Sequence, residues 1–171
     1  MFLNTQGRVL FDALIYPGGG GGGDHSEDFL LDIDQKCSNL AKKHLSMYKI
    51  RRKVAIDIES QYSVFGAFNP DLSEESSETP PGGDGVMIFP DPRLRSLGTR
   101  ILIDKDRLDQ ISSHLPSQTN LCSAEDFLQQ RCLLGVTEGA GEIVPGKVTP
   151  LEYNLGKFPP LQSSGTDMLR F

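Results

Sequence analysis

Hydrophobic and polar positions along the chain predict strands and helices in alternation. Residues 8–16 are rich in β-branched and aromatic types and alternate only partly, which predicts a strand with one buried face. Residues 29–33 predict a second strand. Apolar side chains recur every three or four residues from Cys37 to Tyr48, and this spacing predicts an amphipathic helix with Asp34 as its N-cap. Further strands are predicted at residues 53–58, 62–68, 86–89 and 100–103.

Two shorter helices complete the predicted elements. Asp104 can cap a helix that ends before Pro116, and Ser123 with Asp126 resembles a capping box ahead of a helix over residues 127–132. Hairpin-adjacent strands with helices on one face indicate antiparallel pairing. The predicted fold class is therefore α+β, with a mainly antiparallel sheet and helices on one face.

Three segments show no hydrophobic period. A glycine tract from Gly18 to Gly23 separates the first two strands and predicts a flexible connection. Residues 69–85 are acidic and rich in Ser, Pro and Gly, so they are predicted to be a disordered insertion. Residues 156–171 are predicted to be a disordered, divergent tail. The predicted domain is therefore residues 1–155, interrupted by the insertion.

The bulk composition excludes several classes of function. The 171 residues carry a net charge of −6, which argues against a nucleic-acid-binding surface, because phosphate contacts need clustered Lys and Arg. No apolar run approaches the roughly 18 residues that a membrane helix needs, so no membrane insertion is predicted. Three cysteines without C-x-x-C spacing predict neither a disulfide framework nor a metal site. Cys37 and Cys132 fall on predicted apolar helix faces, where a thiol packs as a small hydrophobe.

Two charged residues stand among apolar neighbours. Asp12 interrupts the apolar strand at residues 9–15, and a carboxylate on a mostly buried strand needs a charged partner, hydrogen-bond donors or a ligand. Periodicity leaves two alternatives for Asp12, a place on the solvent face and a side chain aimed into a pocket. Arg131 lies on a helix face with apolar neighbours and is predicted to be a structural ion-pair partner.

Ordered blocks of the sequence resemble a known family. The segment Leu3–Val9 (LNTQGRV), continued through Asp12 to Tyr16, resembles the L-N-x-x-G-x-V/I-x-x-D-x-x-x-Y motif of the aminomethyltransferase T-protein and its YgfZ-like relatives, the GcvT-like family. Several later blocks look like the mitochondrial iron–sulfur cluster assembly branch of that family. These blocks are residues 29–34, 48–54, 91–93, 131–136 and 150–155.

The resemblance implies a fold and a cofactor. Members of this family fold as three domains around a folate-sized central pocket, so the chain is expected to be a fragment of the folate-binding region with a ferredoxin-like middle part. Asp12 falls on the carboxylate that lies beside the folate in the T-protein, which favours the pocket-facing alternative. The implied cofactor is tetrahydrofolate, with Asp12 and Asn4 as its binding residues.

The resemblance also implies a function. The assembly branch acts as an accessory factor in 4Fe-4S cluster assembly and protein maturation in the mitochondrial matrix, with A-type iron–sulfur scaffold proteins and 4Fe-4S client enzymes as partners. The implied role is non-enzymatic despite the transferase-like fold, so no catalytic residue is predicted. The alternative is a folate-dependent aminomethyltransferase of the glycine-cleavage type, because one scaffold hosts both functions.

The sequence departs from the family pattern at both ends. After the block at residues 150–155 the family continues toward a Lys-Gly-Cys-Tyr-x-Gly-Gln-Glu motif, whereas this sequence turns to Gly156-Lys157-Phe158. At the other end, Met1-Phe2-Leu3 leads straight into strand-like sequence without an Arg-rich targeting segment. The resemblance therefore predicts a chain that is truncated at both ends and impaired in activity.

Overall fold

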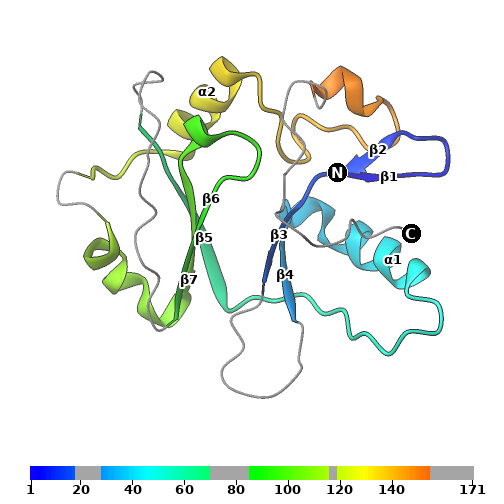
Figure 1. Cartoon of the computed structure of the whole chain (residues 1–171), viewed down its shortest axis with the longest axis horizontal. Helices are drawn as coiled ribbons and strands as arrows, with labels where there is room; N and C mark the ends of the chain where they lie inside the picture. The colour runs from blue at the N-terminus through cyan, green and yellow to red at the C-terminus, as the bar shows by residue number, and fades with distance from the viewer. Residues whose placement is uncertain (18–27, 70–84, 116–118, 155–171) are drawn as a thin grey trace.

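The computed structural model describes residues 1–17, 28–69, 85–115 and 119–154 (Figure 1). The described strands pair antiparallel and alternate with helices, which confirms the predicted α+β class. The glycine tract, nearly all of the predicted 69–85 insertion and the predicted tail lie outside the described residues, so the expectations about them stay predictions. None of the helices in the described ranges is long and apolar enough to cross a membrane.

The predicted first strand is divided in two at Asp12. β2 (Val9–Phe11) pairs with β1 (Phe2–Leu3), whereas β3 (Leu14–Pro17) pairs with β4 (Phe29–Asp32). The chain thus passes from one two-stranded sheet to another where a single continuous strand was expected. Such a change of sheet needs a bend in the strand, and the bend leaves the polar residue at the junction of the two sheets.

Helix α1 (Ser38–Tyr48) packs against the β1–β2 pair. It continues from a 3-10 turn, η1 (Gln35–Cys37), and the Asp34 carboxylate accepts a hydrogen bond from the amide two residues on at 2.8 Å. This hydrogen bond confirms the predicted cap. Ala41 on the apolar face of α1 packs with Phe11 in a buried cluster, so the helix is held by the hydrophobic stripe that predicted it.

The second half of the chain contains a three-stranded sheet. Its order is β5 (Tyr62–Ala67), β7 (Thr99–Asp104) and β6 (Val86–Pro90), with both outer strands antiparallel to β7. The central strand is buried at four consecutive positions, 100–103, as expected for a strand covered on both faces. The three strands predicted in this part of the sequence are confirmed.

The prediction of a strand at residues 53–58 is wrong. Residues 51–60 form neither strand nor helix, and the side chains of Val54 and Ile58 are 50% and 55% exposed. Strand propensity reflects packing on a sheet, and a β-branched segment without a neighbouring strand gains nothing from it. The local sequence favours a strand there but supplies no pairing partner.

Helix α2 (Ala124–Leu134) lies beside the three-stranded sheet. It begins at the predicted capping box of Ser123, which is confirmed, and ends at Gly135, whose φ of 71° provides the left-handed stop. The ring of Phe127 on α2 lies 5.6 Å from the ring of Phe68, just beyond β5. This aromatic contact fixes α2 against the sheet.

The prediction of a regular helix after Asp104 is wrong in the type of helix. The segment forms a 3-10 helix, η3 (Lys105–His114), with non-helical geometry at Arg107, although Asp104 caps it as expected. Its sequence is rich in Asp and Ser, whose side chains compete with the backbone and weaken a regular α-helix. Two further 3-10 turns are η2 (Arg95–Leu97) and η4 (Pro150–Tyr153).

Residues 136–148 return from α2 to β2 and join the two halves of the fold. The Val9 amide donates to the carbonyl of Val148 at 2.9 Å, and the Gly146 amide donates to the carbonyl of Val9 at 2.7 Å. This returning segment passes Asp12 at the strand break. It therefore brings residues remote in sequence to Asp12, the acidic position of the predicted first strand.

Candidate functional site

Asp12 lines a cavity at the break between β2 and β3. Its Oδ1 accepts a hydrogen bond from the Gly139 amide at 3.1 Å, which joins the strand break to the segment after α2. The cavity has a volume of about 240 Å³. The structure thus places Asp12 on a cavity wall, and its role in binding a cofactor stays a prediction.

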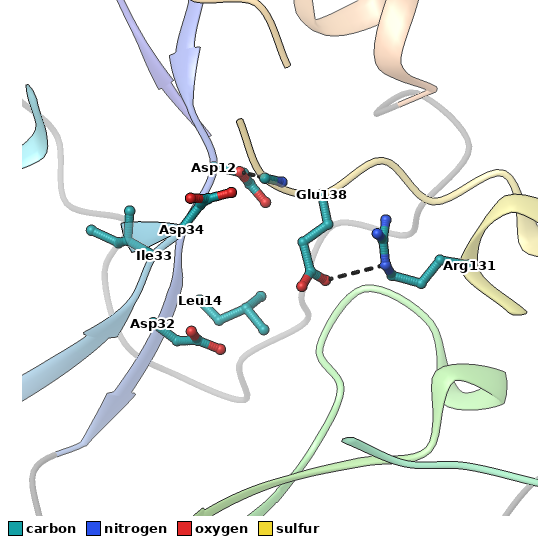
Figure 2. A pocket seen from close by; sticks show the side chains of 8 residues that line it. Asp12, Leu14, Asp32, Ile33, Asp34, Arg131 and Glu138 are labelled. Carbon is teal, nitrogen blue, oxygen red and sulfur yellow. Dashed lines mark hydrogen bonds and ion pairs between the residues drawn. The ribbon is translucent and has the colours of Figure 1, made fainter. Parts of the chain in front are cut away.

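Carboxylates dominate the lining of this cavity, and they come from two sides (Figure 2). The side formed by β2, β3 and β4 contributes three of them, and the segment after α2 contributes the fourth. Two aliphatic side chains and one guanidinium complete the lining. The carboxylates are Asp12, Asp32, Asp34 and Glu138, the aliphatic residues are Leu14 and Ile33, and the guanidinium belongs to Arg131.

The strand side of the cavity holds carboxylates that are poorly compensated. Burial raises the pKa of Asp12, and the hydrogen bond from Gly139 offsets this only in part. Burial likewise raises the pKa of Asp32, even though Nη1 of Arg100 lies 3.7 Å from its Oδ2. Asp34 differs, because hydrogen bonds from backbone amides lower its pKa. Asp12 and Asp32 can therefore accept N–H donors, and they take up a proton more readily than ordinary aspartates.

The opposite side of the cavity is backed by an ion-pair network. The Arg93 guanidinium donates to both oxygens of Asp91, at 3.0 and 2.6 Å, and Nε of Arg100 lies 3.3 Å from the same carboxylate. Glu138 pairs with Arg93 at 2.7 Å and also with Arg100. Burial alone would raise the pKa of Asp91 and of Glu138, but the guanidinium groups outweigh it and lower both pKa values.

Arg131 connects this network to α2. Its Nη2 donates to Oε1 of Glu142 at 2.8 Å and its Nη1 to Oε2 at 3.3 Å, which confirms the predicted structural ion pair. The same Nη1 donates to the carbonyl of Val136 at 3.0 Å. Arg131 is only 6% exposed, so it holds the end of α2 to the segment that follows while it lines the cavity.

Asn4, the other residue predicted to bind the cofactor, lies in the turn between β1 and β2. Its Oδ1 accepts hydrogen bonds from the amides of Gln6 and Arg8, both at 2.9 Å. These bonds close the turn, as Asx side chains commonly do. The structure does not bring Asn4 to the cavity that Asp12 lines, and its assignment as a binding residue stays a prediction.

Sequence reasoning missed three carboxylates of this cavity, of which Asp34 was predicted only as a helix cap and Asp32 and Glu138 were not singled out at all. Asp32 lies directly opposite Leu14 in the β3–β4 register, so pairing the two predicted strands would have placed it near Asp12. Glu138 lies in an irregular segment, and nothing in its local sequence indicates that it faces the cavity. The strand register could thus have indicated Asp32, whereas the sequence holds no such indication for Glu138.

The three cysteines differ in environment. Cys37 is buried in the cluster around Phe11, as predicted for a small hydrophobe, and burial raises the pKa of its thiol. The prediction for Cys132 is wrong, because it is exposed, as is Cys122. The apolar face of α2 turns Phe127 inward and leaves Cys132 at the surface. Across the described ranges, no group of three or more His, Cys, Asp or Glu side chains could hold a metal ion.

The chain has curated relatives over nine tenths of its length. It is 34% identical over 158 residues to the iron–sulfur cluster assembly factor IBA57, mitochondrial, of Homo sapiens, which covers 90% of this chain and 42% of that protein. The protein of the same name from Mus musculus gives the same identity and coverage. The homologue from Neurospora crassa is 29% identical over 162 residues, covering 90% of this chain and 36% of that protein. No protein-family model matches the chain.

These relatives show what the chain is similar to. Its α+β fold is consistent with the GcvT/YgfZ-like class that the motif around Asp12 predicts. Within that class, the homologues of the chain are mitochondrial iron–sulfur cluster assembly factors named IBA57. It spans about two fifths of the length of the mammalian relatives, at 42%.

Proposed function

We propose that this chain serves as part of an accessory factor for 4Fe-4S cluster assembly and protein maturation in the mitochondrial matrix. The observation that carries the proposal is the match to assembly factors named as mitochondrial over 90% of the chain. The role is non-enzymatic, with no catalytic residue assigned. The partners in this proposal are A-type iron–sulfur scaffold proteins and the 4Fe-4S client enzymes.

The cavity beside Asp12 fits the pterin end of a tetrahydrofolate better than the whole molecule. Its volume of about 240 Å³ lies below the roughly 300–1,000 Å³ of typical ligand pockets, so it accepts a ring system and leaves the remainder outside. A pterin carries several N–H groups along one edge, and the carboxylates of Asp12 and Asp32 are suitable acceptors. Leu14 and Ile33 offer apolar contact to the ring.

The same lining disfavours the glutamate tail of folate. Four of the lining side chains are carboxylates, and the one guanidinium, Arg131, is already paired with Glu142. With Glu138 in the position shown, an anionic tail in this cavity would meet like charge without a free counter-ion. In the proposed complex Asp12 and Asp32 hold the N–H edge of the ring and the tail points away from the cavity. Bound tetrahydrofolate would supply a one-carbon carrier.

Calorimetric titration with tetrahydrofolate tests this cofactor assignment on the full chain. Asp12→Asn is expected to weaken binding at least about tenfold, because a charge-assisted hydrogen bond contributes roughly 1.5–3 kcal/mol. Asp109→Asn, on an exposed carboxylate of η3, is the matched control and should bind like the parent. Equal binding by all three proteins, or binding by none, would remove the support for Asp12.

Complementation tests the assembly role separately. In cells that lack the endogenous factor, a chain with the proposed function restores the activity of 4Fe-4S enzymes and leaves 2Fe-2S enzymes unchanged. Failure to rescue, with the chain folded and present in mitochondria, would contradict the proposal for this chain. Transfer of an aminomethyl-derived one-carbon unit to tetrahydrofolate would instead support the aminomethyltransferase alternative, which no feature of the relatives favours.

A further inference from the structure

One oxygen of Glu138 is the meeting point of three guanidinium groups. Its Oε2 lies 2.7 Å from Nη1 of Arg93 and 3.8 Å from Nε of Arg131, and Nη2 of Arg100 also contacts it. These three arginines, here called the arginine cluster, come from the turn after β6, from β7 and from α2. Elements from distant parts of the chain thus aim their donors at a single point.

The three guanidinium groups of the arginine cluster have enough other carboxylates nearby to balance their charge without Glu138. Arg93 is paired in bidentate fashion with Asp91, and Arg131 is paired with Glu142. Arg100 contacts Asp91 and also lies within 3.7 Å of Asp32. Without Glu138 the three guanidinium groups would still face three carboxylates, those of Asp32, Asp91 and Glu142. The position of Glu138 is therefore that of an additional anion.

The Glu138 carboxylate reaches two of the three guanidinium groups closely but leaves a donor of the third unsatisfied. Nη1 of Arg93 lies 2.7 Å from Oε2 of Glu138, whereas Nε of Arg131 lies 3.8 Å from it, is buried and has no hydrogen-bond acceptor within the described part of the chain. Arg131 is 6% exposed, so water does not readily reach its Nε. A buried donor without an acceptor is costly and rare in folded proteins. A group with oxygens pointing in several directions would satisfy Nε of Arg131 as well.

The site can be reached, and Glu138 is its movable member. The Glu138 side chain is 28% exposed, whereas those of Arg100 and Arg131 are 7% and 8% exposed. Figure 2 shows Glu138 extending along the cavity from an irregular segment, with its carboxylate directed toward Arg131. Rotation of this one side chain would open the arginine cluster to the cavity while the arginines stay fixed by their other carboxylates.

We propose that the arginine cluster of Arg93, Arg100 and Arg131 is a binding site for a phosphate-type oxyanion, held closed in this structure by the Glu138 carboxylate. A tetrahedral oxyanion presents three or more oxygens, which matches donors arriving from three directions, whereas Glu138 offers them a single oxygen. A monoanionic phosphate group would carry, at the meeting point of the three arginines, the same charge that the Glu138 carboxylate carries there in this structure. This site is distinct in chemistry from the proposed pterin contacts of Asp12 and does not depend on them.

Titration of the full chain with inorganic phosphate at constant ionic strength tests this site, read out by the NMR signals of the arginine Nε–Hε groups. The parent chain is expected to show a saturable shift of the Arg131 Nε–Hε signal. Glu138→Ala is expected to bind about tenfold more tightly if Glu138 leaves the site about a tenth of the time. Asp109→Ala is the control, because Asp109 is an exposed carboxylate of η3 outside the arginine cluster. It should not gain affinity.

Several outcomes would overturn the proposal. A parent chain without a saturable Arg131 signal contradicts the site, whatever the variants do. Glu138→Gln preserves side-chain volume, and if Glu138→Ala fails to fold, a folded Glu138→Gln that binds no more tightly than the parent counts equally against it. Equal gains in Glu138→Ala and Asp109→Ala would indicate a general charge effect and would contradict the site. Acetate binding as tightly as phosphate would contradict the assigned class of ligand.

Discussion

Two aspartates near the cavity, the half-buried Asp12 and the buried Asp91, show that burial by itself does not set the charge of a carboxylate. Asp12 lies at the strand break, where one backbone amide hydrogen-bonds it and burial raises its pKa. Asp91 is more deeply buried, at 3% exposure, yet its pKa is lowered because Arg93 binds it through both oxygens and Arg100 lies beside it. The number of donors that meet each carboxylate accounts for the difference.

The two aspartates consequently serve different purposes. Asp91 ties the turn after β6 to β7 through the guanidinium groups of Arg93 and Arg100, which it shares with Glu138. Asp12 carries a charge that the fold compensates only weakly, which is typical of a residue kept for a ligand. Asn substitution at each position changes charge with little change in volume, so it separates these purposes directly.

Asp91→Asn is expected to have the largest effect, a loss of about 3–5 kcal/mol in the free energy of unfolding, because it leaves buried arginines without their carboxylate. Urea denaturation at neutral pH measures this loss. The ordinary aspartate pKa is near 3.8 and that of folded Asp91 is lower, so the stabilisation exists above that pH and disappears on acidification. A loss below about 1 kcal/mol would mean that the network relaxes around the neutral amide.

The same network marks the limit of what the sequence could predict. Strands at residues 62–68, 86–89 and 100–103 follow from periodicity because each finds its partner among the others. The segment at 53–58 has equal propensity and no partner, and the strand at 8–16 changes sheets at Asp12, neither of which a periodic pattern encodes. Local sequence indicates extended backbone, while pairing is a property of the whole fold.

The residues of the cavity and of the network behind it also divide into those that the sequence could indicate and those that it could not. Asp12 could be singled out because a carboxylate in an apolar strand violates the local pattern, and Arg131 because it lies among apolar helix neighbours. Glu138 meets Arg100 across 38 positions of sequence, from a segment with no regular structure. No local signal marks such a contact, so the ion-pair network behind the cavity could be found only in three dimensions.

Asp12→Asn is expected to act in the opposite direction, with a gain of up to about 1 kcal/mol in the free energy of unfolding at neutral pH. The folded pKa of Asp12 is raised above its ordinary value near 3.8, so the parent chain loses stability as pH rises through that range. The amide variant does not ionise and so does not lose this stability. The free energies of unfolding of parent and variant should therefore become equal at acidic pH. Stability curves measured at several pH values test the sign. A destabilised Asp12→Asn at neutral pH would show that the charged form is well compensated after all.

Asp34→Asn is expected to have the smallest effect of the three, within about 0.5 kcal/mol of the parent, because Asn and Asp are comparable N-caps. Asp34 lines the same cavity, but its carboxylate accepts backbone hydrogen bonds from Lys36 at 2.8 Å and Ala140 at 2.9 Å, and an amide oxygen can replace one of them. Asp34→Ala, which removes the acceptor altogether, should cost about 1 kcal/mol. Thermal or urea unfolding of the pair separates hydrogen bonding from charge. If the two variants were equally destabilised, the negative charge of Asp34 would matter more than its acceptor role, and Asp34 would resemble Asp91.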